Sequence, residues 1–209
     1  MDYRLSLKFD AAALEAIYAA GEQVTLARRA GEGAVPLVWI AFTPYIVNAV
    51  SWQDSYMLYA SHARVQPGAI VHLDALTAAE PGWTYAFAHE AFSGAAGGAR
   101  DAFTVRNELE EPLAFGLAQQ ATVNGDPITA ARDLMHVAEG RSATFRPHEE
   151  LSIFLSRNMR SGSVLERIPG NALTVALSTS FSHAEVGFDA SLGVFYLRHA
   201  SLGNVAFAG

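Results

Sequence analysis

The chain has 209 residues and no cysteine, which excludes disulfide bonds and thiolate zinc sites. Its formal net charge is −7 and Lys8 is its only lysine, so the basic surface typical of nucleic-acid binding is not expected. Because 51% of the residues are hydrophobic, the chain can bury a sizeable core, and we expect one folded domain over residues 1–209.

The N-terminal segment shows no targeting signal. Residues 1–4 lead into a charged, alternating segment and not into the apolar stretch of a signal peptide. No segment approaches the roughly 18 consecutive apolar residues of a membrane-spanning helix. We therefore expect a soluble cytoplasmic protein with no transmembrane segment, and release without a leader is compatible with the sequence. The excess of alanine, and of arginine over lysine, favours a bacterial origin.

One α-helix is well specified, over residues 11–20. Asp10 is a suitable N-cap, and the alanines that follow it are strong helix formers. Leu14 and Ile17 fall on one face by their spacing, and Gly21 stands where a helix commonly ends in a left-handed conformation.

Beyond residue 21 the hydrophobic period changes from 3.6 to 2, which is typical of β-strands. The expected strands are at 24–26, 35–42, 56–60, 69–73, 83–88, 103–105, 113–123, 151–156, 162–168, 173–178, 185–189 and 193–198. Asn124-Gly125 predicts a tight hairpin turn, the glycine-rich segment 93–99 a mobile loop, and residues 129–138 a short helix. The pattern predicts a mainly β fold, an antiparallel β-sandwich of about ten strands with one N-terminal helix.

Common catalytic and nucleotide-binding motifs are missing from the sequence, which has no G-x-G-x-x-G, P-loop, H-E-x-x-H or G-x-S-x-G pattern. Seven scattered histidines are either surface residues or parts of one metal centre drawn from separate strands. They are His62, His72, His89, His136, His148, His183 and His199. We favour surface positions, and the sequence assigns no catalytic residue, metal ligand or cofactor. For the acidic group Glu108, Glu110 and Glu111 we likewise favour a solvated turn over an acid–base pair.

The most informative region is 39–59, which holds six tryptophan, tyrosine and phenylalanine residues. Tryptophan and tyrosine combine an apolar ring with a polar tip, which suits sugar faces and choline headgroups. We expect the connection 43–54 to form an exposed aromatic loop. The candidate ligand-binding residues are Tyr45, Asn48, Trp52, Asp54 and Tyr56, with rings that stack on the ligand and polar groups that orient it. The alternative is that the large aromatics of this region fill the core.

These features favour a non-enzymatic recognition module that binds a glycan or a zwitterionic lipid headgroup through an aromatic surface loop. Two alternatives stay open. An enzyme would use histidine, glutamate and tyrosine side chains, with or without a metal, and would be favoured by convergence of His72, His89 and His183. A self-assembling protein would use its long apolar strands as a subunit interface and form a homo-oligomer.

Overall fold

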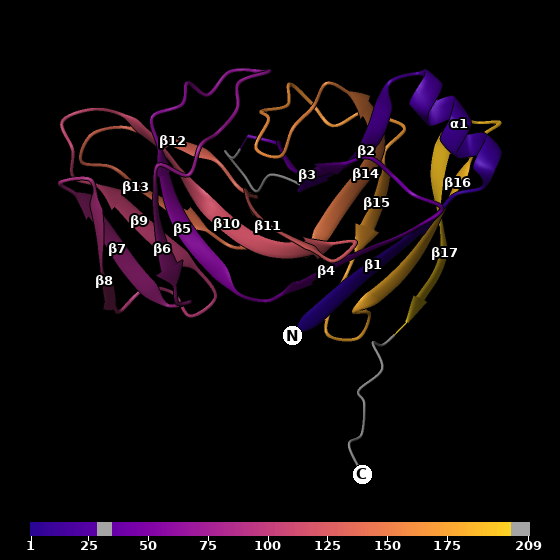
Figure 1. Ribbon diagram of the computed structural model, residues 1–209. Helices are drawn as coiled ribbons and strands as arrows, with labels where there is room; N and C mark the ends of the chain where they lie inside the picture. Colours follow the sequence, from indigo (N-terminus) through magenta and orange to yellow (C-terminus); the bar gives the residue numbers. More distant parts are fainter. Residues whose placement is uncertain (29–34, 202–209) are drawn as a thin grey trace, which may run out of the picture.

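A computed structural model describes residues 1–28 and 35–201 of the chain (Figure 1). These ranges contain one α-helix, α1 (Ala11–Ala19), and seventeen β-strands arranged in three sheets. The mainly β fold predicted from the sequence is confirmed, although the described residues form more strands than the ten or so expected.

The largest sheet runs through the whole molecule. In spatial order its main path consists of β17 (Val194–Ser201), β16 (His183–Asp189), β1 (Asp2–Lys8), β4 (Val47–Gln53), β10 (Leu113–Val123), β5 (Tyr56–Ser61) and β6 (Ala75–Ala79). Two more strands, β11 (Asp126–Ala131) and β12 (Met135–Val137), pair with successive parts of β10. The sheet is mixed, because β1 pairs with β16 in parallel and with β4 in antiparallel orientation.

Each of the two smaller sheets covers one half of the large sheet. One consists of β13 (Ser142–Phe145), β9 (Phe103–Asn107), β7 (Trp83–Ala88) and β8 (Ala91–Ala96). The other consists of β15 (Leu173–Ala176), β14 (Glu150–Arg157), β2 (Glu22–Arg28) and β3 (Leu37–Phe42). In Figure 1 the first of these sheets lies at the left-hand end of the molecule, and the second lies at and to the right of its centre.

Two main hydrophobic clusters lie between these layers. The first joins β1 and β16 of the large sheet to β2 and β14, with residues such as Leu5, Leu26 and Ile153 fully buried. The second joins β5 and β10 to β7 and β9, and Phe87 and Phe115 are fully buried in it. This layering of sheet on sheet, with apolar side chains alternating inward, agrees with a sandwich-like architecture.

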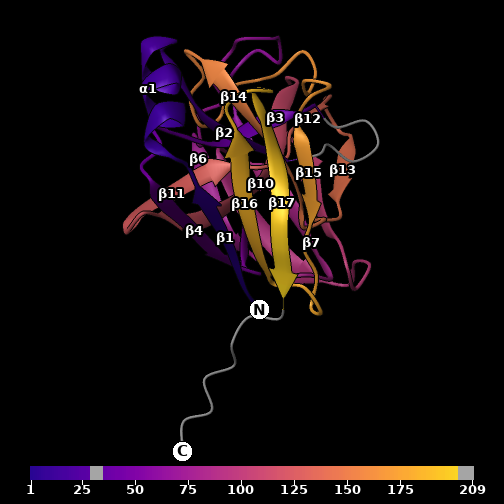
Figure 2. The same cartoon turned by 90° about the vertical axis from the view of Figure 1, so that its right-hand side faces the viewer.

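The predicted N-terminal helix is confirmed. Its N-cap is Asp10, whose side-chain oxygen accepts a hydrogen bond from the backbone N–H of Ala13 at 2.7 Å. Gly21 follows the helix with a φ of 65°, a left-handed conformation that favours glycine. Leu14 and Ile17 are buried, and the helix lies beside β2 at one end of the molecule (Figure 2). No helix in the described part of the chain is long and apolar enough to span a bilayer.

The predicted hairpin turn at Asn124-Gly125 is also confirmed, and it joins β10 to β11. Both turn residues have positive φ angles, 53° and 101°, as a tight two-residue hairpin turn requires. The helix expected at 129–138 is wrong, because this segment forms the end of β11 and all of β12. Pairing with the long edge of β10 satisfies its backbone groups and overrides the helix propensity of its alanines.

Three further local predictions are wrong. The segments 69–73 and 162–168 form no regular strand, although they lie together through one isolated bridge, Ile70 with Ser163, and a few further backbone hydrogen bonds. Residues 93–96 of the expected mobile loop belong to β8, where Gly94 lies opposite Tyr85 and leaves room for the tyrosine ring. A glycine-rich composition therefore marks a close ring–backbone approach in this sheet.

The connection expected at 43–54 contains an additional strand, β4. Its burial alternates, with Asn48, Val50 and Trp52 facing inward. Both β4 and β5 pair with β10, and an irregularity separates them: Trp52 is paired with Ala121, whereas Met57 is paired with Ala118. Four residues, 53–56, thus stand opposite two residues of β10. Such a bulge bends the strand and redirects its side chains. The side chains of Asp54 and Tyr56 belong to this bulged segment.

Candidate functional site

The structure separates the aromatic residues that the sequence analysis grouped together. Tyr45 is exposed and precedes β4, whereas Trp52 lies near the other end of that strand and is only 3% exposed. Asn48 is also buried, and its side chain holds the backbone of Tyr45 through bonds to its N–H and C=O groups. Tyr45, Asn48 and Trp52 therefore form no common exposed platform, and Trp52 takes the alternative role of filling the core.

Trp52 is the centre of an aromatic stack. Its ring stacks on Tyr3 with centroids 5.6 Å apart and meets the edge of Trp39 at 5.3 Å. The register of β1 with β4, which pairs Tyr3 with Trp52, places the first two rings side by side. The indole N–H of Trp52 donates a hydrogen bond of 2.8 Å to Oε2 of Glu149. This contact connects the hydrophobic core to a group of buried charges.

The buried charges form a compensated cluster of two arginines and two carboxylates. Glu149 accepts hydrogen bonds of 2.9 Å from Arg28 and from Arg132, one on each carboxylate oxygen. Arg132 also lies 2.9 Å from Asp133, and the side-chain oxygen of Gln119 accepts from both arginines. The arginine side chains are at most 1% exposed and that of Glu149 is 7% exposed. Burial of this kind is tolerated only when every charge has partners, as it has here.

The pKa values reflect this compensation. Burial by itself raises the pKa of Glu149, but Arg28 and Arg132 outweigh it and lower the value to about 2. Burial lowers the pKa of Arg28 to about 10, an effect that Arg132 reinforces and Glu149 opposes. Glu149 and the arginine are therefore both charged at neutral pH. Because the pKa of Glu149 is so low, its carboxylate is a poor general acid or base under these conditions.

Tyr56 connects the buried cluster to the surface. Its hydroxyl lies 2.5 Å from Oδ1 of Asp54 and 3.0 Å from Oε1 of Glu149, so its single hydrogen stands between two carboxylates. Burial raises the pKa of Tyr56, and the negative charge of Glu149 raises it further, so the phenol is neutral. The guanidinium of Arg132 lies 5.1 Å from the centre of the Tyr56 ring and helps to hold it.

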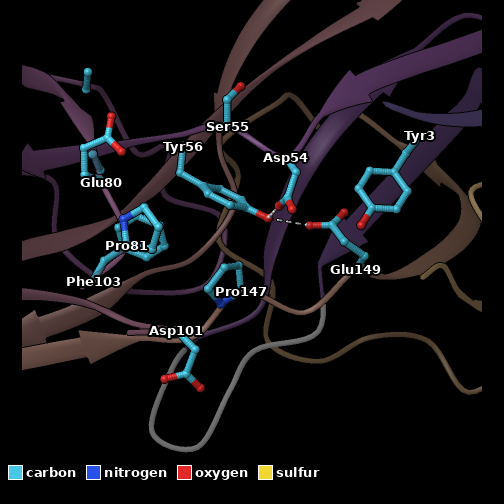
Figure 3. A pocket seen from close by; sticks show the side chains of 12 residues that line it. Tyr3, Asp54, Ser55, Tyr56, Glu80, Pro81, Asp101, Phe103, Pro147 and Glu149 are labelled. Atoms are coloured by element: carbon cyan, nitrogen blue, oxygen red, sulfur yellow. Dashed lines mark hydrogen bonds between the residues drawn. The ribbon is translucent and has the colours of Figure 1, made fainter. Parts of the chain in front are cut away.

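These groups form one wall of a hollow of about 560 Å³, which we call the acidic pocket (Figure 3). It lies where the large sheet, the β7–β9 sheet and the segment before β14 meet. The lining residues are Tyr3, Asp54, Ser55, Tyr56, Ala78, Ala79, Glu80, Pro81, Asp101, Phe103, Pro147 and Glu149. The size is within the range of roughly 300–1,000 Å³ that is typical of small-ligand sites.

The acidic pocket is negatively charged. Of its four carboxylates, Glu149 is neutralised by the buried arginines and Asp101 lies 3.7 Å from the exposed Arg146. Asp54 and Glu80 have no cationic partner among the described residues. The described lining contains no lysine, arginine or histidine. Two uncompensated carboxylates thus line the same pocket as the half-buried ring of Tyr56, and Asp54 is in contact with its hydroxyl.

The histidines do not converge. His89 lies in the β7–β8 turn and His183 in β16, at opposite ends of the molecule (Figure 1). Within residues 1–28 and 35–201, no group of three or more histidine, aspartate and glutamate side chains is arranged to hold a metal ion. Glu108 and Glu111 are exposed. Glu108 lies 3.8 Å from Arg106, and Glu111 lies 3.8 Å from His62. The structure therefore adds no support to the histidine-based enzyme.

Of the five candidate ligand-binding residues, Asp54 and Tyr56 line the acidic pocket, whereas Trp52 supports it from the core. Sequence reasoning missed Arg28, Arg132 and the central role of Glu149. Glu149 is far from both arginines in the sequence, so no spacing indicated that these charges meet. No protein-family model, curated protein or solved structure matches the chain, so it is the geometry of the pocket that bears on function.

Proposed function

We propose that the chain is a recognition module without catalytic activity, and that it binds the ammonium group of a ligand in the acidic pocket. The observation that carries this proposal is the composition of the lining, in which the carboxylates of Asp54 and Glu80 and three aromatic rings stand without a cationic partner among the described residues. Carboxylates and ring faces are the groups that hold organic cations in proteins. A zwitterionic lipid headgroup and a glycan with a free amine both offer such a cation.

Asp54 and Tyr56 have the central roles in this proposal. Asp54 is exposed and receives one hydrogen bond from the tyrosine hydroxyl, which leaves its second oxygen for the ligand. The ring of Tyr56 is fixed by Asp54, Glu149 and Arg132, so it needs no reordering when a cation approaches. The low pKa of Glu149 means that its carboxylate stays ionised at all physiological pH values, so its ion pairs with Arg28 and Arg132 hold this wall of the pocket in place.

Titration calorimetry with choline and with glucosamine tests the proposal. We expect both cations to bind, and Asp54→Asn to weaken binding about tenfold or more, since hydrogen bonds to charged groups are worth roughly 1.5–3 kcal/mol. Asp126→Asn is the matched control, because Asp126 is exposed at the hairpin turn and lines no part of the pocket. The proposal fails if neither cation binds, or if the two variants bind equally well.

A further inference from the structure

A second hollow adjoins the acidic pocket. Its volume is about 440 Å³, and it shares Tyr3 and Ser55 with the acidic pocket. It lies at the end of β4, where Ser51 is paired with Thr122 of β10, and Trp52 and Ala121 also line it. A ligand anchored beside Asp54 can therefore continue past Ser55 into this second hollow. We call this second hollow the sheet groove.

Five of the nine residues that line the sheet groove carry serine or threonine hydroxyls or glutamine amides. They are Ser51, Gln53, Ser55, Gln120 and Thr122, and the other four are Asp2, Tyr3, Trp52 and Ala121. Ser51, Ser55, Gln120 and Thr122 make no side-chain hydrogen bond within the described residues, and Gln53 uses only its NH₂ group, which donates to Asp2. Hydroxyl and amide groups can both donate and accept, which is the chemistry that matches a series of sugar hydroxyls.

The charges of the groove select among ammonium ligands. The described lining of both hollows contains no lysine, arginine or histidine, and the groove adds the carboxylate of Asp2. A phosphate attached to the ammonium group would therefore enter a region of negative charge. Arg4 is paired with Ser51 in the register of β1 and β4, but it is not among the residues that line the groove. A neutral polyhydroxylated extension avoids this repulsion.

We infer that the ligand is an oligosaccharide with a free amino sugar. Its ammonium group binds in the acidic pocket beside Asp54, and the hydroxyls of the neighbouring sugar bind Gln120 and Thr122 in the sheet groove. This inference rests on the proposed function for the ammonium site and adds the groove as a second subsite. It favours the amino sugar over the zwitterionic lipid headgroup as the source of the cation.

The inference is tested by binding at mildly acidic pH, where the sugar amine is charged. The probes are glucosamine, its β-1,4-linked trimer, the N-acetylated trimer, choline and phosphocholine. The variants are Thr122→Ala for the groove, Asp54→Asn for the acidic pocket, and Thr174→Ala as a matched control on an exposed position of β15 in another sheet. Circular dichroism confirms that each variant is folded.

We expect the glucosamine trimer to bind about tenfold more tightly than glucosamine and than the N-acetylated trimer. Thr122→Ala should weaken binding of the glucosamine trimer several-fold and leave binding of glucosamine unchanged. Asp54→Asn should weaken binding of both ligands, and Thr174→Ala should weaken binding of neither. If the trimer binds no more tightly than glucosamine, or if Thr122→Ala does not change its binding, the second subsite in the sheet groove is refuted and the ammonium site stands. Tighter binding of phosphocholine overturns the amino sugar in favour of the headgroup. If the N-acetylated trimer binds as tightly as the glucosamine trimer, or if no cation binds, the proposed function is refuted as well.

Discussion

Glu149→Gln is the substitution that most directly tests the buried charge cluster. Glutamine has nearly the same shape as glutamate, but it removes the negative charge that Arg28 and Arg132 share. Among the described residues, Asp133 would then be the buried carboxylate left to oppose two buried guanidinium groups. Removal of one partner from a buried ion pair typically costs about 3–5 kcal/mol. A pKa lowered from 4.5 to about 2 gives a similar figure, about 3 kcal/mol.

The effect of this substitution depends on pH in a defined direction. Because the pKa of Glu149 is lower in the folded chain than its usual 4.5, its contribution is complete above about pH 4.5. It is lost as the pH falls through the folded value of about 2. We therefore expect the difference in stability between the wild type and Glu149→Gln to be largest at neutral pH and to shrink progressively toward pH 2.

Urea unfolding followed by circular dichroism measures the effect, with Glu185→Gln as the matched control. Glu185 forms a surface pair of 3.6 Å with Lys8, whose side chain is 44% exposed, and such pairs contribute about 0–1 kcal/mol. For a chain of this size, 3–5 kcal/mol corresponds to a fall in Tm of roughly 6–20 °C. If Glu149→Gln and Glu185→Gln are equally stable, or if the gap stays constant down to about pH 3, Glu149 does not hold the cluster together.

Two further predictions concern packing around the same cluster. Trp52→Phe keeps an aromatic ring but removes the indole N–H that donates to Glu149, so urea unfolding should show a loss of about 1.5–3 kcal/mol. Gly116→Ala should lower stability by at least about 3 kcal/mol, because the added methyl group would collide with the backbone oxygen of Asp133. Gly170→Ala, whose methyl group meets nothing within 4 Å, should change stability by less than about 0.5 kcal/mol, and equal effects of the two alanines would contradict this packing.

The parts of the fold that were predictable are those fixed by local chemistry. The helix at Ala11–Ala19 has its cap, its apolar face and its terminal glycine within one stretch of sequence. The hairpin turn at Asn124-Gly125 needs two positive φ angles, which few residue pairs adopt readily. In both places a few neighbouring residues determine the backbone, so the sequence was sufficient.

The missed strands depend on distant partners. β8 is rich in alanine and glycine, and it is held by pairing with β7 and by the ring of Tyr85 over Gly94. In β4 the inward positions include the polar Asn48, whose amide bonds the backbone of Tyr45, so the apolar alternation is broken in the sequence. The intrinsic propensity of such segments is weak, and tertiary context decides their conformation.

The candidate site was only half predictable for a related reason. Asp54 and Tyr56 are close in sequence and were chosen for their chemistry, and the bulge between β4 and β5 places both at the acidic pocket. Glu149 is separated from Arg28 by 121 residues and from Arg132 by 17. Neither separation corresponds to a helical or strand period, so nothing in the sequence indicates that these charges meet.

The arrangement divides two tasks between carboxylates of the same pocket. Glu149 accepts hydrogen bonds from Arg28, Trp52 and Arg132 and shares the single hydrogen of the Tyr56 hydroxyl with Asp54, so it fixes the shape of the wall but has little charge left for a ligand. Among the described residues, the side chain of Asp54 has the tyrosine hydroxyl as its partner and no cation. Loss of Glu149 should therefore reduce stability first, and ligand affinity only through disorder of Tyr56. Loss of the Asp54 charge should reduce affinity with little change in stability.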